Sequence, residues 1–206
     1  MKQVTGETNS QPETKYVSIQ LRLDGHSFSE EVLDSLAKGK KPVEISALSA
    51  KTLLVPRELF DEKVAPALMQ INGMTPTDSE RILHTDPTQP FVALIAVNRT
   101  SADRIQARLG NRVQWTTPLL HSGDYSLPCV WIFRYEELVY LKIWTQRNLR
   151  LAEILIVPTS EDLLYYITEL LPEMELANCD IRLAGNPTKQ DSHLLKEYFK
   201  HVSVCE

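Results

Sequence analysis

The glycines of this chain are few and scattered, which limits the ways in which its backbone can bind phosphate. Its 206 residues include seven glycines, and the shortest interval between two of them is the 13 positions from Gly110 to Gly123. The Walker P-loop and the Rossmann G-x-G-x-x-G motif both need clustered glycines that turn several backbone amides onto a phosphate group. The sequence therefore excludes both of these nucleotide-binding motifs.

The side chains that most often hold metals or act as nucleophiles also lack a recognised spacing. The three cysteines are too far apart for a C-x-x-C metal site, and the five histidines form no H-E-x-x-H motif. No G-x-S-x-G segment marks a serine nucleophile. Glu161 and Asp162 are an adjacent acid pair, but they follow Thr159 and Ser160 at the predicted start of a helix, where carboxylates complement the helix dipole. We therefore predict no catalytic residue and no metal ligand.

The elements that would position any site begin with a strand. Apolar and polar residues alternate from 17 to 23, and Asp24-Gly25 then predicts a type I′ hairpin whose return strand includes Val32. Pro66 lies inside an apolar pattern of helical spacing and should kink that helix. The later elements expected in this half are a strand at 44–55, a helix at 60–71, a short strand at 81–84, a buried strand at 91–97 and a helix at 102–109 capped by Thr100 or Ser101.

The second half shows the same kinds of pattern in the same order. We expect strands at 129–135, 138–144 and 149–157, a helix after Pro158, a strand at 179–183 and a helix at 192–202. Each half thus reads as three strands, a helix, a strand and a helix.

Two junctions also match between the halves at residue level. Residues 53–56 (LLVP) match residues 155–158 (LIVP), and Asn98 and Thr100 match Asn186 and Thr188. Together with the element order, these matches predict an internal duplication. The expected organisation is a disordered tail at 1–15, a first half at 16–122 and a second half at 123–206.

Two such halves facing each other across a cleft, each of them ribonuclease H-like, make up the actin-like ATPase fold. The sequence also resembles the domain of unknown function 3822 family, a group of bacterial proteins described as actin-like in fold and otherwise uncharacterised. The resemblance rests on four segments, 18–28, 161–166, 183–185 and 194–198. Members are usually longer, so some elements of the first half are expected to be trimmed. The predicted fold class is therefore α/β, with duplicated ribonuclease H-like halves (βββαβα) in an actin-like ATPase arrangement.

This resemblance implies where a nucleotide would bind. Actin-like ATPases hold phosphate in one hairpin of each half, and here Asp24, Gly25 and Ser27 occupy the first hairpin, although a plain type I′ turn explains Asp24-Gly25 as well. The second hairpin, at 135–138, lacks glycine and carries two glutamates that would repel a triphosphate. The glycine pair that holds adenosine in this fold is reduced to Gly185 followed by Asn186. We therefore expect no working ATPase.

A ribonuclease H-type nuclease is not predicted either. Its two-metal chemistry needs three or four carboxylates gathered on one half. The first predicted strand offers Ser18, Gln20 and Arg22 on its polar side, and Asp180 lies at the wrong end of its strand in the second half. The carboxylate cluster does not assemble.

Composition limits the compartment and the partners. The first 15 residues are polar, the longest aliphatic run has only the seven residues 91–97, and the cysteines suggest no disulfide framework. We expect a cytoplasmic protein without a membrane segment. The net charge of −5 and the short basic runs make nucleic acid an unlikely partner class.

The predicted function is binding without catalysis and without a cofactor, with another protein as the expected partner. The aromatic residues proposed for that interface, unless they belong to the core, are Trp115, Trp131, Trp144 and Tyr165. The alternative is a divergent ATP-binding protein, an ATPase or a kinase, that holds Mg-ATP through Asp24, Ser27 and Gly185.

Overall fold

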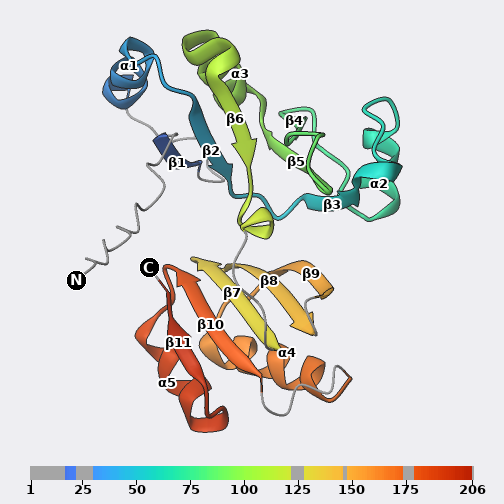
Figure 1. The fold of residues 1–206 in the computed structure, drawn as a ribbon, viewed down its shortest axis with the longest axis vertical. Helices are drawn as coiled ribbons and strands as arrows, with labels where there is room; N and C mark the ends of the chain where they lie inside the picture. The colour runs from blue at the N-terminus through green and yellow to red at the C-terminus, as the bar shows by residue number, and fades with distance from the viewer. Residues whose placement is uncertain (1–16, 22–29, 122–127, 146–147, 174–178, 206) are drawn as a thin grey trace, which may run out of the picture.

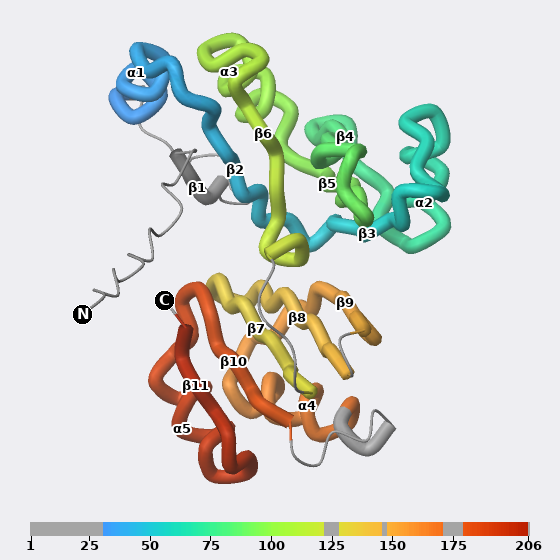
Figure 2. Tube along the Cα trace, viewed as in Figure 1, coloured from blue at the N-terminus to red at the C-terminus, as the bar shows by residue number. Residues whose placement is uncertain are grey.

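The chain forms two lobes joined by one connection. The computed structural model describes residues 17–21, 30–121, 128–145, 148–173 and 179–205. Strands β1 to β6 with helices α1 to α3 build one lobe, and strands β7 to β11 with α4 and α5 build the other (Figures 1 and 2). The described strands form three sheets, two in the first lobe and one in the second.

The second lobe is a five-stranded mixed sheet with helices on one face. Its strand order is β11-β10-β7-β8-β9, in which β7, β8 and β9 are antiparallel neighbours and β10 and β11 run parallel to β7. The bounds are β7 Cys129–Tyr135, β8 Leu138–Thr145, β9 Asn148–Ile156, α4 Ser160–Glu173, β10 Asp180–Gly185, α5 Lys189–Tyr198 and β11 Val202–Val204. This order of three strands, helix, strand and helix agrees with the prediction, and β11 adds a further strand.

The first lobe contains a parallel sheet and a separate antiparallel sheet. The parallel sheet has the order β1-β2-β6 and packs against α1 and α3, whereas the antiparallel sheet has the order β3-β5-β4 and packs against α2. The bounds are β1 Val17–Leu21, α1 Glu30–Lys38, β2 Val43–Ala47, β3 Thr52–Pro56, η1 Arg57–Leu59, α2 Ala65–Ile71, β4 Glu80–His84, β5 Phe91–Asn98, α3 Arg99–Leu109, η2 Gly110–Arg112, β6 Val113–Thr116 and η3 Pro118–Leu120.

Two expectations for the first lobe are wrong. The segment 44–55 is not one strand, because the chain turns at Ser49, whose carbonyl accepts a hydrogen bond from Thr52 Oγ1 at 2.9 Å. β2 and β3 consequently lie in different sheets. Val32 belongs to α1 rather than to a return strand. The predicted hairpin at Asp24-Gly25 lies outside the described residues.

The ends of three helices also differ from the predictions. Pro66 lies in the first turn of α2, where its missing N–H costs nothing, so it starts the helix instead of kinking it. Asn98, not Thr100 or Ser101, caps α3, since its side chain accepts from the Ser101 amide at 3.0 Å. Helix α5 ends at Tyr198, and the residues after His201 form β11.

The segments that suggested a duplication lie in sheets of different kinds. Residues 53–56 fall in β3, at an edge of the antiparallel sheet, whereas residues 155–158 span the last two residues of β9 in the five-stranded sheet and the two residues after it. Asn98 ends the central strand β5 of the antiparallel sheet, whereas Asn186 follows β10, which lies between two parallel neighbours. The internal duplication therefore stays a prediction.

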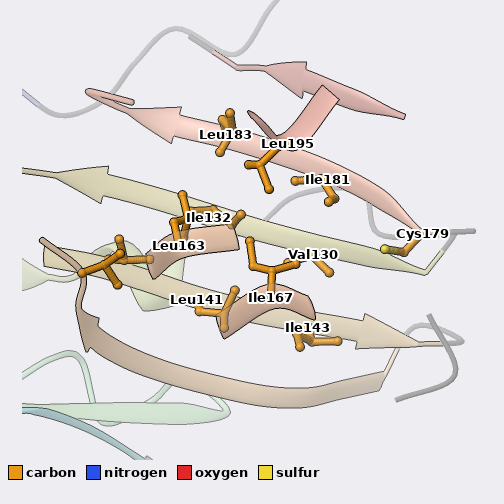
Figure 3. Packing of buried hydrophobic residues seen from close by; sticks show 12 residues of the cluster. Val130, Ile132, Leu141, Ile143, Leu163, Ile167, Cys179, Ile181, Leu183 and Leu195 are labelled. Carbon is orange, nitrogen blue, oxygen red and sulfur yellow. The ribbon is translucent and has the colours of Figure 1, made fainter. Parts of the chain in front are cut away.

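Both faces of the five-stranded sheet are buried. One face packs against α4 and α5 through aliphatic side chains that Figure 3 shows interleaved, among them Ile132, Leu141, Leu163 and Ile167. The opposite face is aromatic and packs against Leu48 and Leu119 of the first lobe. The second face is therefore the contact between the lobes, and it also bounds the candidate site.

Candidate functional site

A cavity of about 540 Å³ lies between the two lobes. Its first-lobe walls come from β2 and from the segment that runs from β6 through η3. Its second-lobe walls come from β7, the end of β10 and Cys205 after β11. Its lining residues include Glu44, Ser46, Thr117, His121, Trp131, Phe133, Gly185 and Asn186. The cavity thus occupies the cleft in which the predicted fold would place a ligand.

Gly185 and Asn186 are the two predicted site residues that the structure places in this cleft. Gly185 has a φ of +77°, and a Cβ atom there would stand 2.5 Å from the carbonyl oxygen of Arg134 and 3.0 Å from the Phe133 ring. Only glycine fits such a close approach. The Asn186 amide donates a 2.8 Å hydrogen bond to the same Arg134 carbonyl, so it is turned toward β7 and not toward a ligand.

The other three predicted site residues, Asp24, Gly25 and Ser27, lie outside the described residues. Their proposed role in nucleotide binding stays a prediction.

The β7–β8 hairpin, where the fold would hold phosphate in the second lobe, is closed by internal bonds. Arg134 forms an ion pair with Asp191 at 2.7 Å, with the two side chains 5% and 0% exposed. Its remaining guanidinium nitrogens donate to the carbonyls of Glu136 and Val157 at 2.9 and 3.0 Å. Glu136 takes a φ of +53° at the turn, a conformation for which glycine is favoured. The cation nearest to this corner of the cleft is thus bound to the protein itself.

Asp191 connects this hairpin to both helices of the lobe. Its carboxylate accepts from the Ser160 hydroxyl at 2.7 Å and from the Thr188 amide at 2.6 Å, in addition to Arg134. Thr188 and Asp191 form the capping box of α5. This spacing, a threonine three residues before an acid, is the signal in the sequence that would have revealed the network.

A second buried cation, Lys142, lies under the floor of the cleft. Its Nζ atom is 4.2 Å from the centre of the Trp131 ring and donates to the carbonyl of His121. The His121 ring stacks on Trp131 with a centroid distance of 5.6 Å. Burial lowers the pKa of Lys142 to about 8. Burial, and then the charge of Lys142, also lower the pKa of His121, which Glu44 partly opposes.

Lys142 was not predicted, although the alternation of β8 contains the signal. Val139, Leu141 and Ile143 face the aliphatic core, so Tyr140 and Lys142 must face the other side of the sheet. The Tyr140 hydroxyl there accepts from the Ser49 amide at 2.7 Å and binds the first lobe to the second.

The four aromatic residues predicted as an interface do not share a surface. Trp131 is buried in the contact between the lobes, and Trp115 and Trp144 are partly buried against core clusters. Of these four, Tyr165 alone is exposed, at 59%, on α4. The three tryptophans therefore belong to the core, which was the alternative to their forming an interface.

Within the acid pair on α4, Asp162 caps the helix, in agreement with the prediction of a capping role. Asp162 accepts from the Thr159 hydroxyl at 2.8 Å, and its own amide donates to that hydroxyl at 3.1 Å. Across the described ranges, no three side chains among His, Cys, Asp and Glu gather in a way that would hold a metal ion. Cys129 and Cys179 are buried free thiols, and burial raises the pKa of Cys129 to about 11, which makes it a poor nucleophile.

Comparison with known proteins shows the fold. No family model matches the chain, and no curated protein matches it. A solved structure from Bacteroides thetaiotaomicron VPI-5482, described as a protein with an actin-like ATPase fold and unknown function, is similar with a TM-score of 0.75 and 16% identity. The similarity covers 92% of this chain and 90% of that chain. The predicted α/β, actin-like ATPase fold is thus confirmed.

Two further solved structures are similar at lower scores. They are the cytoplasmic domain of EpsL, an inner membrane component of the type II secretion system of Vibrio cholerae, and the PilM-PilN type IV pilus biogenesis complex. Their TM-scores are 0.41 and 0.46 and their identities 11% and 12%; they cover 85% and 90% of this chain, and 71% and 78% of those chains. In the chain itself, none of the described helices is long and apolar enough to cross a membrane.

Proposed function

We propose that this protein is a non-catalytic member of the actin-like fold class that acts by binding another protein. The observation that carries the proposal is an exposed apolar surface on the antiparallel unit of the first lobe. We call it the α2 surface and define it by Leu59, Val64, Ile71 and Phe91. The exposed fractions of Leu59 and Ile71 are 68% and 82%, and those of Val64 and Phe91 are 43% and 37%.

These four residues belong to one packed unit. Val64 and Ile71 are seven positions apart, so they lie on the same side of α2. Phe91 pairs with Pro56 across β3 and β5, and the Arg57 amide donates to the Pro90 carbonyl at 3.0 Å, which brings η1 next to that strand end. Contiguous exposed apolar groups typically mark interaction sites, and we infer that these four form one such surface.

The packing in the interior of the same unit indicates that the α2 surface is ordered before a partner binds. Met69 is fully buried and Ala65 nearly so beneath α2, against Leu94 and Ala96 of the central strand. A partner that covered Ile71 or Leu59 would gain about 1.5–3 kcal/mol for each side chain fully removed from water. The α2 surface is therefore already ordered in the free protein, so the free energy of binding is not reduced by a cost of folding it.

The chemistry of the cleft supports a role without ATP turnover. Arg134 is bound to Asp191 and to two carbonyls, and the hairpin beside it carries Glu136 and Glu137. The alternative, a divergent nucleotide-binding protein, is favoured by the position of Gly185 and Asn186 at the cleft wall. We rank it second because the backbone groups of this corner hydrogen-bond to each other.

The proposal includes three finer points from the sequence. They are membership in the domain of unknown function 3822 family, a cytoplasmic location and the absence of a required cofactor. The segment resemblance at 161–166 and 183–185 supports the first point, and the free cysteines Cys129, Cys179 and Cys205 agree with a reducing compartment.

A binding experiment with matched variants tests the main proposal. The full chain, Ile71→Glu and the control Ile156→Glu are each used to capture partners from a cell extract, and the stoichiometry of captured proteins is measured. Ile156 is 62% exposed but lies on β9 in the other lobe. We expect one stoichiometric partner with the natural chain and the control, and its loss with Ile71→Glu. A partner retained equally by all three, or no partner at all, contradicts the α2 surface.

A thermal unfolding series with Mg-ATP tests the alternative. A ligand at 100 times its dissociation constant stabilises the folded state by about 2.7 kcal/mol, which is a readily measured shift. We expect no shift at millimolar Mg-ATP. A saturable shift that is lost in Asp24→Ala would favour the nucleotide-binding alternative.

A further inference from the structure

We propose that the basic loop between α1 and β2 binds a short acidic segment of a protein through the ammonium groups of Lys38, Lys40 and Lys41. This loop follows α1, which lies beside α3, whereas α2 lies on the other side of the first lobe (Figure 1). The inference therefore goes beyond the proposed function and does not depend on the α2 surface.

The tertiary structure holds this basic run in place as an ordered loop. The Arg112 guanidinium donates to the carbonyls of Leu36 and Ala37, at the end of α1, at 3.0 and 3.3 Å. It also donates to the carbonyls of Gly39 and Lys41, within the loop, at 2.6 and 3.3 Å. One side chain from a distant part of the sequence thus fixes the loop backbone at several points.

Local features of the loop restrict its backbone further. The Gly39 amide donates to the Leu36 carbonyl at 3.1 Å, and Pro42 fixes its own φ just before β2 begins. A surface that is already ordered in the free protein loses less conformational entropy when it binds a partner. The three lysines are therefore presented from a backbone that is ready for binding.

The positive charge of this loop is not balanced by neighbouring acids. Lys38, Lys40 and Lys41 are exposed, and across the described ranges none of the three ammonium groups has an ion-pair or hydrogen-bond partner. Arg112 adds a fourth positive charge, and its described partners are uncharged carbonyls. The whole chain has a net charge of −5, so this cluster of cations differs in sign from the molecule that carries it. Such a cluster attracts anionic groups.

The nearest acids in the sequence do not compensate this charge. Residues 35–43 contain no Asp or Glu, and Asp34 on α1 already forms an ion pair with Arg108 of α3. Glu31 is exposed on α1, seven positions before Lys38, which is about 10 Å along the helix axis. The positive surface therefore has a limited extent, and a short anionic group is the complement to it.

The dimensions and the composition of this region favour an acidic peptide over other anions. Residues 38–41 span at most about 10 Å, which corresponds to a run of three or four carboxylates in an extended peptide. The sequences of α1, the loop and α3 contain no aromatic residue on which a nucleic acid base could stack. A membrane surface would extend across α1 as well, where the exposed Glu31 repels it.

Fluorescence anisotropy of a labelled hexaglutamate peptide tests the proposal with two variants of equal net charge. The loop variant of the full chain carries Lys38→Gln, Lys40→Gln and Lys41→Gln. The control variant removes three exposed lysines from the second lobe by Lys189→Gln, Lys196→Gln and Lys200→Gln. Thermal unfolding of each variant verifies that it is folded.

We expect saturable binding of hexaglutamate to the natural chain at low ionic strength, weakened by added salt because these charges are exposed. The loop variant should bind the peptide at least about tenfold more weakly, since it lacks three of the four cations. The control variant should bind it as the natural chain does. The Ile71→Glu variant should also bind it normally, so that failure of this proposal and failure of the partner proposal at the α2 surface are distinguishable.

The other outcomes contradict the proposal. If hexaglutamate does not bind, or if the loop and control variants lose the same affinity, the loop is not a binding site. Tighter binding of a six-nucleotide single strand or of vesicles that contain phosphatidylserine would assign the loop to a nucleic acid or to a membrane. Displacement of the peptide by millimolar inorganic phosphate would assign it to a free anion.

Discussion

At the scale of single residues, position 185 requires glycine for two separate reasons. It has a positive φ, and it also lies directly against the Arg134 carbonyl and the Phe133 ring. Other residues can adopt the positive φ at a moderate cost in free energy. The close approach to the Arg134 carbonyl and the Phe133 ring leaves no room for any side chain. This glycine therefore forms the cleft wall whether or not a ligand uses it.

Gly185→Ala is expected to destabilise the protein by about 2 kcal/mol or more, because the new methyl group meets backbone at 2.5 Å as well as an unfavourable φ. Gly73→Ala is the matched control, since Gly73 has a φ of +72° and open space around it. The control should cost about 1 kcal/mol. Urea unfolding of both variants measures the difference, and equal losses would show that the contact at Gly185 relaxes freely.

At the scale of elements, the buried Arg134–Asp191 pair holds the β7–β8 hairpin to the first turns of α4 and α5. Every charged oxygen and nitrogen of this pair that is described above has a partner within the lobe. Removing one charge would leave the other buried and uncompensated, which is usually more costly than the net value of the pair.

Asp191→Asn should therefore cost about 3–5 kcal/mol of unfolding free energy. Asp162→Asn weakens an exposed cap on α4 and should cost about 1 kcal/mol or less. Chemical denaturation of the two variants provides the comparison. If Asp191→Asn lowers the unfolding free energy no more than Asp162→Asn does, the buried pair does not stabilise the packing of the β7–β8 hairpin against α4 and α5.

At the scale of the whole molecule, two described polar side chains join the lobes across an aromatic face. Tyr140 exchanges hydrogen bonds with the backbone of Ser49, and Lys142 donates to the carbonyl of His121 at the connection between the lobes. Leu48 and Leu119, with the partly buried Ala50 and Leu54, add apolar contacts from the first lobe. Among the described residues, these groups help to set the position of one lobe on the other, and hence the cleft.

Lys142 should make stability increase with pH. Its pKa is lowered from 10.5 to about 8 in the folded state, mainly by burial, with Cys129 opposing and the His121 carbonyl next to its ammonium group. The unfolded state therefore binds more protons at Lys142 between pH 8 and 10.5, and its contribution to the unfolding free energy rises with pH through that window. We expect the natural chain to gain roughly 1–3 kcal/mol relative to Lys142→Met between pH 7 and pH 10.5.

The comparison with Lys142→Met isolates this effect from other groups. Tyr140 and Cys129 have raised pKa values in the folded state, so both lower stability as pH rises above about 9 in either protein. Denaturation curves at pH 7 and pH 10.5 give the difference. A constant difference between the two proteins would mean that Lys142 titrates normally.

The second lobe was predictable because its signals are local. The strand-like apolar runs at 129–135 and 138–144, the helix after Pro158 and the capping of α4 by Asp162 all depend on neighbours in sequence. The first lobe was harder, since the turn at Ser49 divides an apolar stretch between two sheets, and Pro66 starts a helix that periodicity alone extends to Phe60. Which sheet a strand joins is decided by distant partners.

The α/β class, the lack of clustered glycines and the order of elements in the second lobe follow from composition and short-range periodicity, so they could be read from the sequence. Which distant residues pair with each other depends on the packing of the folded chain. Arg134 and Asp191 are 57 positions apart and Ser49 and Tyr140 are 91 apart, and their pairing depends on how the lobes and strands pack. Burial, which is a property of that packing, then lowers the pKa of Lys142 and leaves Thr117 Oγ1 without a hydrogen-bond partner in the described structure.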